Sequence, residues 1–124
     1  MTFEKTAVDE FNTMMGVSPE EMVKRLVDAG ADIVGANCGN GSEDMTDIVK
    51  KIRSCNSNIP VLIQANAGIP VYHDGKIRYG ETPEQMAVVA EKLIAAGANI
   101  IGGCCGTTPL HIAKIAERVR LYNH

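Results

Sequence analysis

Three cysteines are the residues of this chain best suited to chemistry. Cys38 follows a short apolar segment that ends in Asn37, and Cys104 and Cys105 are adjacent to each other near the other end of the chain. Three thiolates that converge on one ion make a good zinc set, and three protein ligands leave a fourth position for a substrate. Coordination by zinc holds a thiol as its thiolate near neutral pH. The residue types therefore indicate a metal site that activates sulfur for alkyl transfer.

The cysteines also have plainer interpretations. A cysteine at a strand end often only packs in the interior, and the vicinal pair Cys104 and Cys105 can form a strained disulfide with itself. The glycine-rich segment 102–108 resembles a phosphate cradle in general terms, because a helix start follows it, although the segment has no Lys or Arg. Spacing alone leaves these alternatives open. The fourth cysteine, Cys55, lies at the tail of an expected helix and is interpreted as a bystander.

Two asparagines stand where strands are expected to end. Asn37 directly precedes Cys38, and Asn66 opens the segment Asn66-Ala67-Gly68. Amides at such positions can orient ligands or bind the polar end of a substrate. The alternative is that each amide satisfies the backbone of its own loop. We treat Asn37 and Asn66 as candidate substrate-binding residues. His111, in the first turn of the last expected helix, is expected at the surface or beside the site rather than as a ligand.

A repeat predicts the elements that position these residues. Residues 26–35 (LVDAGADIVG) and 93–102 (LIAAGANIIG) share the pattern of a helix end, a glycine and a short apolar strand. The segments 18–21 (SPEE) and 82–85 (TPEQ) both place a hydroxyl at a helix cap, proline at the first helical position and Glu or Gln at the third. A further start of this kind is expected at 108–109, and a looser one at 42–44. The pattern predicts alternating helices and strands.

The coarse assignment is a parallel α/β architecture. We expect helices at 19–29, 43–54, 83–96 and 109–121, and strands at 32–37, 60–65 and 99–104. The strands are continuous apolar runs, which is typical of parallel strands covered on both faces. The polar connection 68–82 contains His73-Asp74-Gly75-Lys76, which favours an exposed hairpin turn. Reactive groups gather at the carboxyl ends of such strands. Both vicinal thiols can face one point only if the chain leaves the strand there, which the flanking glycines allow.

Composition limits the remaining classes of function. The chain has 124 residues, of which 45% are hydrophobic and 22% charged, as expected for a globular domain. A net charge of −3 does not favour nucleic acid or an anionic membrane as a partner. The amino terminus has no apolar run of signal-peptide length, and no stretch approaches the about 20 apolar residues of a membrane helix. We therefore expect a cytoplasmic protein, with residues 1–124 as one domain.

Three segments resemble the homocysteine S-methyltransferase family in sequence and in order: 35–38 (GANC), 66–70 (NAGIP) and 102–109 (GGCCGTTP). Within that family, the resemblance is greatest to the homocysteine-binding domain of cobalamin-dependent methionine synthases. It implies zinc held by Cys38, Cys104 and Cys105, with the sulfur of homocysteine or a related small thiol as the fourth ligand. It also implies a methyl donor such as methylcobalamin on another domain or protein. Asn37 and Asn66 match strand-end asparagines of the family pattern.

The family domain is a (β/α)₈ barrel, a fold of about 250 residues. The resemblance implies that this chain corresponds to its carboxyl-terminal half, from the end of the fifth strand through the eighth helix. Family strands that hold the amino and carboxylate groups of homocysteine have no counterpart in 1–124. A half barrel exposes two sheet edges and an apolar face, so it should pair with a second copy, a complementary half-barrel chain or a corrinoid protein.

The resemblance implies a homocysteine S-methyltransferase of methionine biosynthesis, incomplete as the isolated chain. The alternative is a non-catalytic zinc-binding or assembly subunit.

Overall fold

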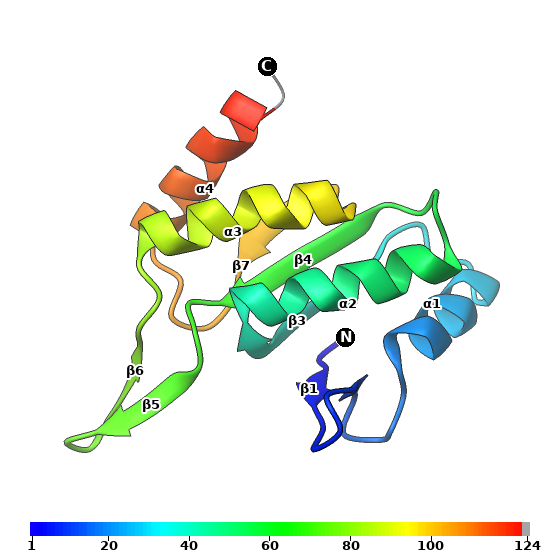
Figure 1. The fold of residues 1–124 in the computed structure, drawn as a ribbon, viewed down its shortest axis with the longest axis horizontal. Helices are drawn as coiled ribbons and strands as arrows, with labels where there is room; N and C mark the ends of the chain where they lie inside the picture. Colours follow the sequence, from blue (N-terminus) through cyan, green and yellow to red (C-terminus); the bar gives the residue numbers. More distant parts are fainter. Residues whose placement is uncertain (123–124) are drawn as a thin grey trace.

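A computed structural model gives the structure of residues 1–122, the side chain of Asn40 excepted (Figure 1). Residues 123 and 124, which belong to the expected domain, lie outside the described part. Helices and parallel strands alternate from residue 19 onward, as the repeat predicts. The strands are β1 (Glu4–Lys5), β2 (Phe11–Asn12), β3 (Val34–Gly41), β4 (Val61–Asn66), β5 (Pro70–His73), β6 (Lys76–Tyr79) and β7 (Ile100–Gly103). The helices are α1 (Pro19–Asp28), α2 (Ser42–Cys55), α3 (Pro83–Ala96) and α4 (Pro109–Tyr122).

The central sheet is parallel and has the strand order β3-β4-β7. Its register pairs Val34 with Val61, and Ile63 with Ile101. Buried side chains of α1, α2 and α3 pack against Val61 and Ile63 in the main core. Figure 1 shows α2 and α3 running along the sheet, with the strand ends directed toward the β5–β6 hairpin. This arrangement confirms the expected parallel α/β architecture.

The opposite face of the sheet differs from the expectation drawn from the sequence. Along β4 the covered side is that of Val61 and Ile63, whereas Gln64 on the other side is exposed. Ile33 and Ile100, on the same side as Gln64, are 48% and 42% exposed. Within the described residues, the strands are therefore covered on one face rather than on both. In a closed barrel that second face is the interior, which the remaining strands cover.

The starts of α1 and α3 follow the capping chemistry of the sequence. The Ser18 hydroxyl oxygen accepts the backbone N–H of Glu21 at 3.1 Å. Thr82 and Gln85 form a complete capping box, with each side chain bonded to the other residue's backbone N–H. Gly97 ends α3 at a φ of 118°, a left-handed conformation that favours glycine. These local signals determine where the two helices begin and where α3 ends.

Two small hairpins flank the sheet. β5 and β6 pair antiparallel around the turn that the sequence predicts at 73–76, and Figure 1 shows this hairpin projecting from the body of the molecule. β1 and β2 also pair antiparallel, near the amino terminus, where the sequence analysis assigned no strands. The amino group of Met1 donates to the Gly35 carbonyl at 2.9 Å, and the Met1 carbonyl accepts the Asn37 N–H at 3.0 Å. The first residues therefore lie along the outer edge of β3.

A second apolar cluster joins the end of the chain to the rest of the fold. It contains Ala67, which follows β4, together with Met86 and Ala90 of α3 and Ile115 of α4. Tyr79 of the hairpin packs against the same cluster. No helix among residues 1–122 has the length and apolar character needed to cross a membrane.

Candidate metal centre

The three cysteines singled out in the sequence lie together at the carboxyl ends of the parallel strands. Their sulfur atoms are all within 4.8 Å of one another, and the Sγ atoms of Cys38 and Cys105 are 3.7 Å apart. Cys38 and Cys104 are half-buried, whereas Cys105 is exposed, so the cluster is open to solvent on one side. Cys55 ends α2 and is not part of the cluster, in agreement with its interpretation as a bystander.

A break in the register of β3 presents Cys38 to the cluster. The pairing with β4 is regular up to Asn37, opposite Gln64, and resumes only at Gly41, opposite Asn66. Four residue steps on β3 thus match two steps on β4, which is a bulge. Cys38 lies in this bulge with a φ of 56°, a left-handed conformation that is uncommon for a residue with a side chain. The irregular backbone re-aims the thiol, as bulges beside functional sites often do.

The Cys104–Cys105 pair lies in a turn that begins where β7 ends. β7 stops at Gly103, one residue before the expected strand end, and the Cys104 N–H donates to the Ala65 carbonyl at 2.7 Å. The Thr107 N–H then donates to the Cys104 carbonyl at 3.2 Å. Gly106 follows with a φ of 78°. The chain therefore leaves the strand at this point, and both vicinal thiols face Cys38, as the sequence analysis requires.

Asn66 connects the two cysteine segments. Its side chain is almost fully buried, and its Oδ1 accepts the backbone N–H of Cys105 at 3.1 Å. The neighbouring Ala67 N–H donates to the Cys105 carbonyl at 2.9 Å, so both backbone groups of Cys105 are bonded to the end of β4. Sequence analysis placed Asn66 at a strand end beside the site, and the structure brings it into contact with the cysteines.

Asn37, the second candidate asparagine, is the last residue of the regular part of β3. It is half-buried and lies on the open face of the sheet, opposite Gln64. Its backbone N–H donates to the Met1 carbonyl. Asn37 therefore directly precedes Cys38 in the sequence, and it lies on the face of the sheet that a closed barrel would enclose.

The electrostatics of the three thiols are unequal. A hydrogen bond from the Gly39 backbone, with further bonds from the other thiols and Asn66, lowers the pKa of Cys38. Hydrogen bonds and negative charge from Cys38 and Cys104 raise the pKa of Cys105. Like charges at such distances oppose full ionisation of the cluster. A divalent cation removes this conflict, because coordination deprotonates each thiol outright.

The geometry of the sulfur atoms fits a zinc ion. Tetrahedral thiolate ligands about 2.3 Å from zinc lie about 3.8 Å from one another. The Cys38–Cys105 separation of 3.7 Å is already at that value, and the 4.8 Å limit on the other pairs requires only small side-chain movements. The donor set is soft and anionic, as zinc prefers, and its open side leaves room for a fourth ligand.

A hydrogen-bond network around Glu81 holds the loops beneath the cluster. Its carboxylate accepts the Ser42 hydroxyl at 2.6 Å, and its backbone N–H donates to the Ala67 carbonyl at 2.9 Å. The buried His111 donates from Nε2 to the Glu81 carbonyl at 2.7 Å, because its Nδ1 accepts the Thr108 N–H. Glu81 thus bonds to segments that follow β3, β4 and β7.

The sequence analysis missed part of this network. It did not single out Glu81, and it expected Ser42 near a helix cap rather than inside α2 with its hydroxyl on Glu81. It placed His111 at the surface or beside the site, and the structure buries it beside the site. No spacing rule links residues 42, 81 and 111; only the fold brings them together.

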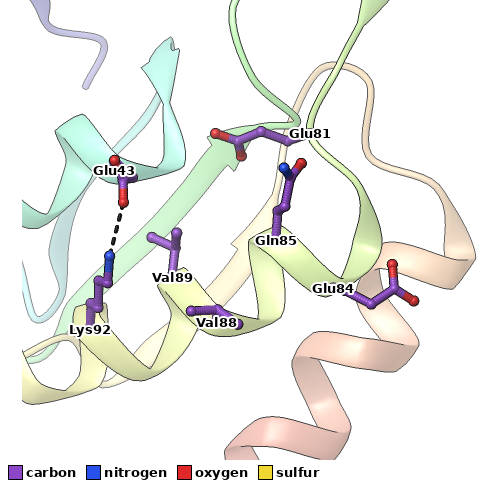
Figure 2. Close-up of a pocket in the computed structure, with 7 residues that line it drawn as sticks. All are labelled: Glu43, Glu81, Glu84, Gln85, Val88, Val89 and Lys92. Carbon is purple, nitrogen blue, oxygen red and sulfur yellow. Dashed lines mark hydrogen bonds and ion pairs between the residues drawn. The ribbon is translucent and has the colours of Figure 1, made fainter.

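A cavity of about 510 Å³ lies between α2 and α3. Figure 2 shows its lining, in which Glu43 forms an ion pair with Lys92 at 2.9 Å and Glu81 and Gln85 lie at the other end. No cysteine lines it. The site with reactive groups is therefore the exposed cysteine cluster and not this cavity.

Comparison with known proteins gives a family match and several similar proteins. The chain matches the homocysteine S-methyltransferase family over residues 1–119. It is 37% identical over 91 residues to methionine synthase from Mycobacterium tuberculosis, covering 73% of this chain and 8% of that protein. Methionine synthase from Mycobacterium leprae is 37% identical over 95 residues, covering 76% of this chain and 8% of that protein.

Solved structures of a homocysteine methyltransferase are also similar to this chain. The apo form of the homocysteine methyltransferase MmuM from Escherichia coli is similar with a TM-score of 0.64 and 27% identity, over 84% of this chain and 33% of that one. Its oxidized form gives 0.61 and 28%, over 83% and 30%. The chain thus spans about a twelfth of the length of the methionine synthases and about a third of the solved methyltransferase.

Proposed function

Because the chain belongs to the homocysteine S-methyltransferase family, we propose that it carries the zinc site of such an enzyme and takes part in methyl transfer to homocysteine or a related small thiol. Cys38, Cys104 and Cys105 would hold the ion. The observation that carries this proposal is the convergence of their three sulfur atoms within 4.8 Å at the strand ends. The fold supports it as well, since active sites of (β/α)₈ barrels lie at this end of the strands.

A bound zinc ion would hold the sulfur of the substrate as a thiolate at neutral pH. In the transfer, that sulfur forms a bond to the methyl carbon of the donor, the bond from this carbon to the donor breaks, and the thiol proton has already gone to solvent. The contribution of this chain is to present three thiols on one side and to leave the other side of the cluster open. The open side is where Cys105 is exposed.

The two asparagines have different supporting observations. Asn37 lies on the open face next to Cys38, so we propose that its amide binds the polar end of the substrate. Asn66 remains a predicted substrate contact through its amide nitrogen. Its oxygen is engaged by the Cys105 N–H, so Asn66 also fixes the turn that carries two of the thiols.

Completion of the pocket requires more polypeptide than residues 1–122. The sheet has three parallel strands, and its second face is partly exposed. A closed barrel has eight strands, so we propose that the rest of a longer chain, a second copy or a complementary half-barrel chain supplies the others. A corrinoid protein or domain with methylcobalamin is the proposed source of the methyl group, and the cytoplasm, where thiols stay reduced, is the proposed location.

A second candidate function follows from the same incompleteness. The chain would be a non-catalytic zinc-binding or assembly module that docks onto a complementary half barrel. The partly exposed second face of the described sheet supports this alternative, because it offers a surface on which another half barrel can dock. Homocysteine binding separates the two candidates, because a module without a substrate pocket shows no thiol-dependent change at the metal.

Zinc content tests the site itself. Purified chain should contain about one zinc ion, as expected for three thiolates with one open position. Cys104→Ser should release the metal, whereas Cys55→Ser, the matched control outside the cluster, should retain it. The measurement is metal analysis together with circular dichroism. Folded protein without metal after purification with zinc present would contradict the proposal.

A further inference from the structure

Gln64 lies in the middle of the open face of the sheet, on the strand between the two cysteine-bearing segments. The register pairs it with Asn37 on β3 and with Gly102 on β7. Asn37 directly precedes Cys38, and Cys104 follows Gly102 by two residues. The side chain of Gln64 is exposed. Gln64 is therefore level with the residues that lead into both groups of thiols.

The neighbouring strand leaves room for this side chain. A Cβ atom added to Gly102 would lie 3.5 Å from Cγ of Gln64 and 3.6 Å from its Nε2, so the Gln64 side chain extends over the glycine. Gln64 and Asn37 also line one cavity of about 240 Å³, which Met1 borders. The two amide-bearing residues thus flank one space on the side of the sheet that a closed barrel would enclose.

Polarity on this face is confined to the end that carries the thiols. The same face further from the cysteines is occupied by apolar side chains, those of Ile33, Leu62 and Ile100. Packed layers inside a (β/α)₈ barrel consist largely of such branched side chains. The two amides form the next layer, at the strand ends where these barrels bind their substrates. Their position therefore favours a binding role over packing.

We propose that Gln64 is a specificity-determining residue: its amide binds the α-amino-acid end of the substrate while the metal holds the sulfur. This inference rests on the proposed function. An amide has N–H donors and a carbonyl acceptor, so Gln64 and Asn37 together can bond to a carboxylate and to an ammonium group. None of the open-face positions of the described parallel strands carries a charged side chain. Such a surface suits a zwitterion, which has no net charge.

The spacing between the amides and the thiols suits homocysteine. In that molecule two methylene groups separate the sulfur from the α-carbon, which carries the ammonium and the carboxylate. Asn37 is one position before Cys38, and a strand advances about 3.3 Å per residue. A sulfur at the open position of the metal therefore brings the polar end to the level of Asn37 and Gln64.

A comparison of two thiols tests this role. 1-Propanethiol keeps the sulfur and the three carbon atoms of homocysteine up to the α-carbon, but it lacks the ammonium and the carboxylate. With cobalt(II) in place of zinc, the absorption of the metal reports the binding of either thiol. Gln64→Leu should weaken homocysteine binding about tenfold, as expected for the loss of a hydrogen bond to a charged group. It should leave the binding of cobalt and of 1-propanethiol unchanged.

Asn58→Leu is the matched control. Asn58 is also an exposed amide, but it precedes β4 at the end of the strand away from the cysteines. This substitution should alter the binding of neither thiol. If the unaltered chain and Gln64→Leu show the same preference for homocysteine over 1-propanethiol, the proposal is overturned, since a packing residue does not distinguish the two thiols.

A metal-free measurement separates this proposal from the proposed function. Norvaline has a methyl group in place of the thiol of homocysteine and keeps its polar end. In the ¹⁵N-labelled chain, millimolar norvaline should move the side-chain amide resonances of Gln64 and Asn37 and leave that of Asn58 in place. If the chain binds no cobalt, the proposed function fails, and these resonances still decide whether the amides bind an amino acid. A Gln64 resonance that norvaline does not move would overturn its role, whatever metal the chain binds.

Discussion

Asn66 determines how closely the two cysteine segments approach each other. It is almost fully buried, and its oxygen is the acceptor for the Cys105 N–H. Asn66→Ala leaves that donor without a partner, so we expect a loss of about 1–3 kcal/mol in the free energy of unfolding. The loss is measured by urea denaturation, and metal content should fall with it.

Asn66→Asp separates the two roles of this side chain. The carboxylate keeps an oxygen for the Cys105 N–H, so most of the stability should return. It removes the amide nitrogen and adds negative charge beside three thiols, so metal-free thiols should ionise less readily. If Asn66→Ala unfolds with the same free energy as the unaltered chain, Asn66 does not hold the turn.

Gly106 is the second residue on which the turn depends. Its φ of 78° disfavours any side chain, and a Cβ there would meet the Tyr79 ring at 2.2 Å. Gly106→Ala should therefore destabilise the fold and displace Cys105, with a lower melting temperature and a lower zinc content. Gly80→Ala is the matched control, since no atom lies within 4 Å of a Cβ at that position. Equal effects of the two substitutions would contradict this account.

At the scale of the elements, the start of α3 is coupled to the site. Thr82 caps this helix, and the residue before it, Glu81, holds the loops beneath the cysteines. Thr82→Ala should cost about 1 kcal/mol of stability, as loss of a cap does. Thr82→Ser keeps the hydroxyl and should restore it. Denaturant unfolding of the three proteins measures the difference, and a Ser variant as unstable as the Ala variant would argue against the cap.

The elements that the sequence predicts are those with local signals. The caps at Ser18 and Thr82 and the glycine at Gly97 each act within one helical turn, and α1 and α3 begin or end as these residues indicate. The turn at 73–76 carries its own signal and forms the expected hairpin. The strand pattern placed three cysteines at the carboxyl ends of parallel strands, which meet at one edge of the sheet. Spacing left their convergence open, and the family resemblance was what implied it.

The features that the sequence does not reveal depend on contacts between distant residues. The bulge at Cys38 is fixed by pairing with β4, and no residue type near Cys38 specifies it. Tyr79 follows three exposed residues of β6, and its partial burial follows only from its packing against the cluster formed with α3 and α4. The short β1–β2 hairpin has two residues in each strand, too few for a periodic pattern.

At the scale of the whole molecule, the uncovered face of the sheet should govern association. Ile33 and Ile100 are partly exposed there, on the side that a barrel would enclose. Ile33→Lys with Ile100→Lys should preserve the fold and reduce self-association, measured by sedimentation at several concentrations. Val88→Lys, an exposed aliphatic position on α3, is the control and should leave the mass unchanged. Undiminished association of the double variant would mean that another surface joins the copies.

The two edge strands of the sheet, β3 and β7, are not equivalent. On β3, Met1 already bonds to the Gly35 carbonyl and to the Asn37 N–H. Among the described strands, β7 pairs only with β4, so an additional strand could pair with its other edge. If two copies closed a ring by joining β3 of one to β7 of the other, the opening residues of each chain would first have to detach. Such a closure would therefore cost the bonds that Met1 makes to Gly35 and Asn37, whereas a strand added at β7 alone would leave them in place.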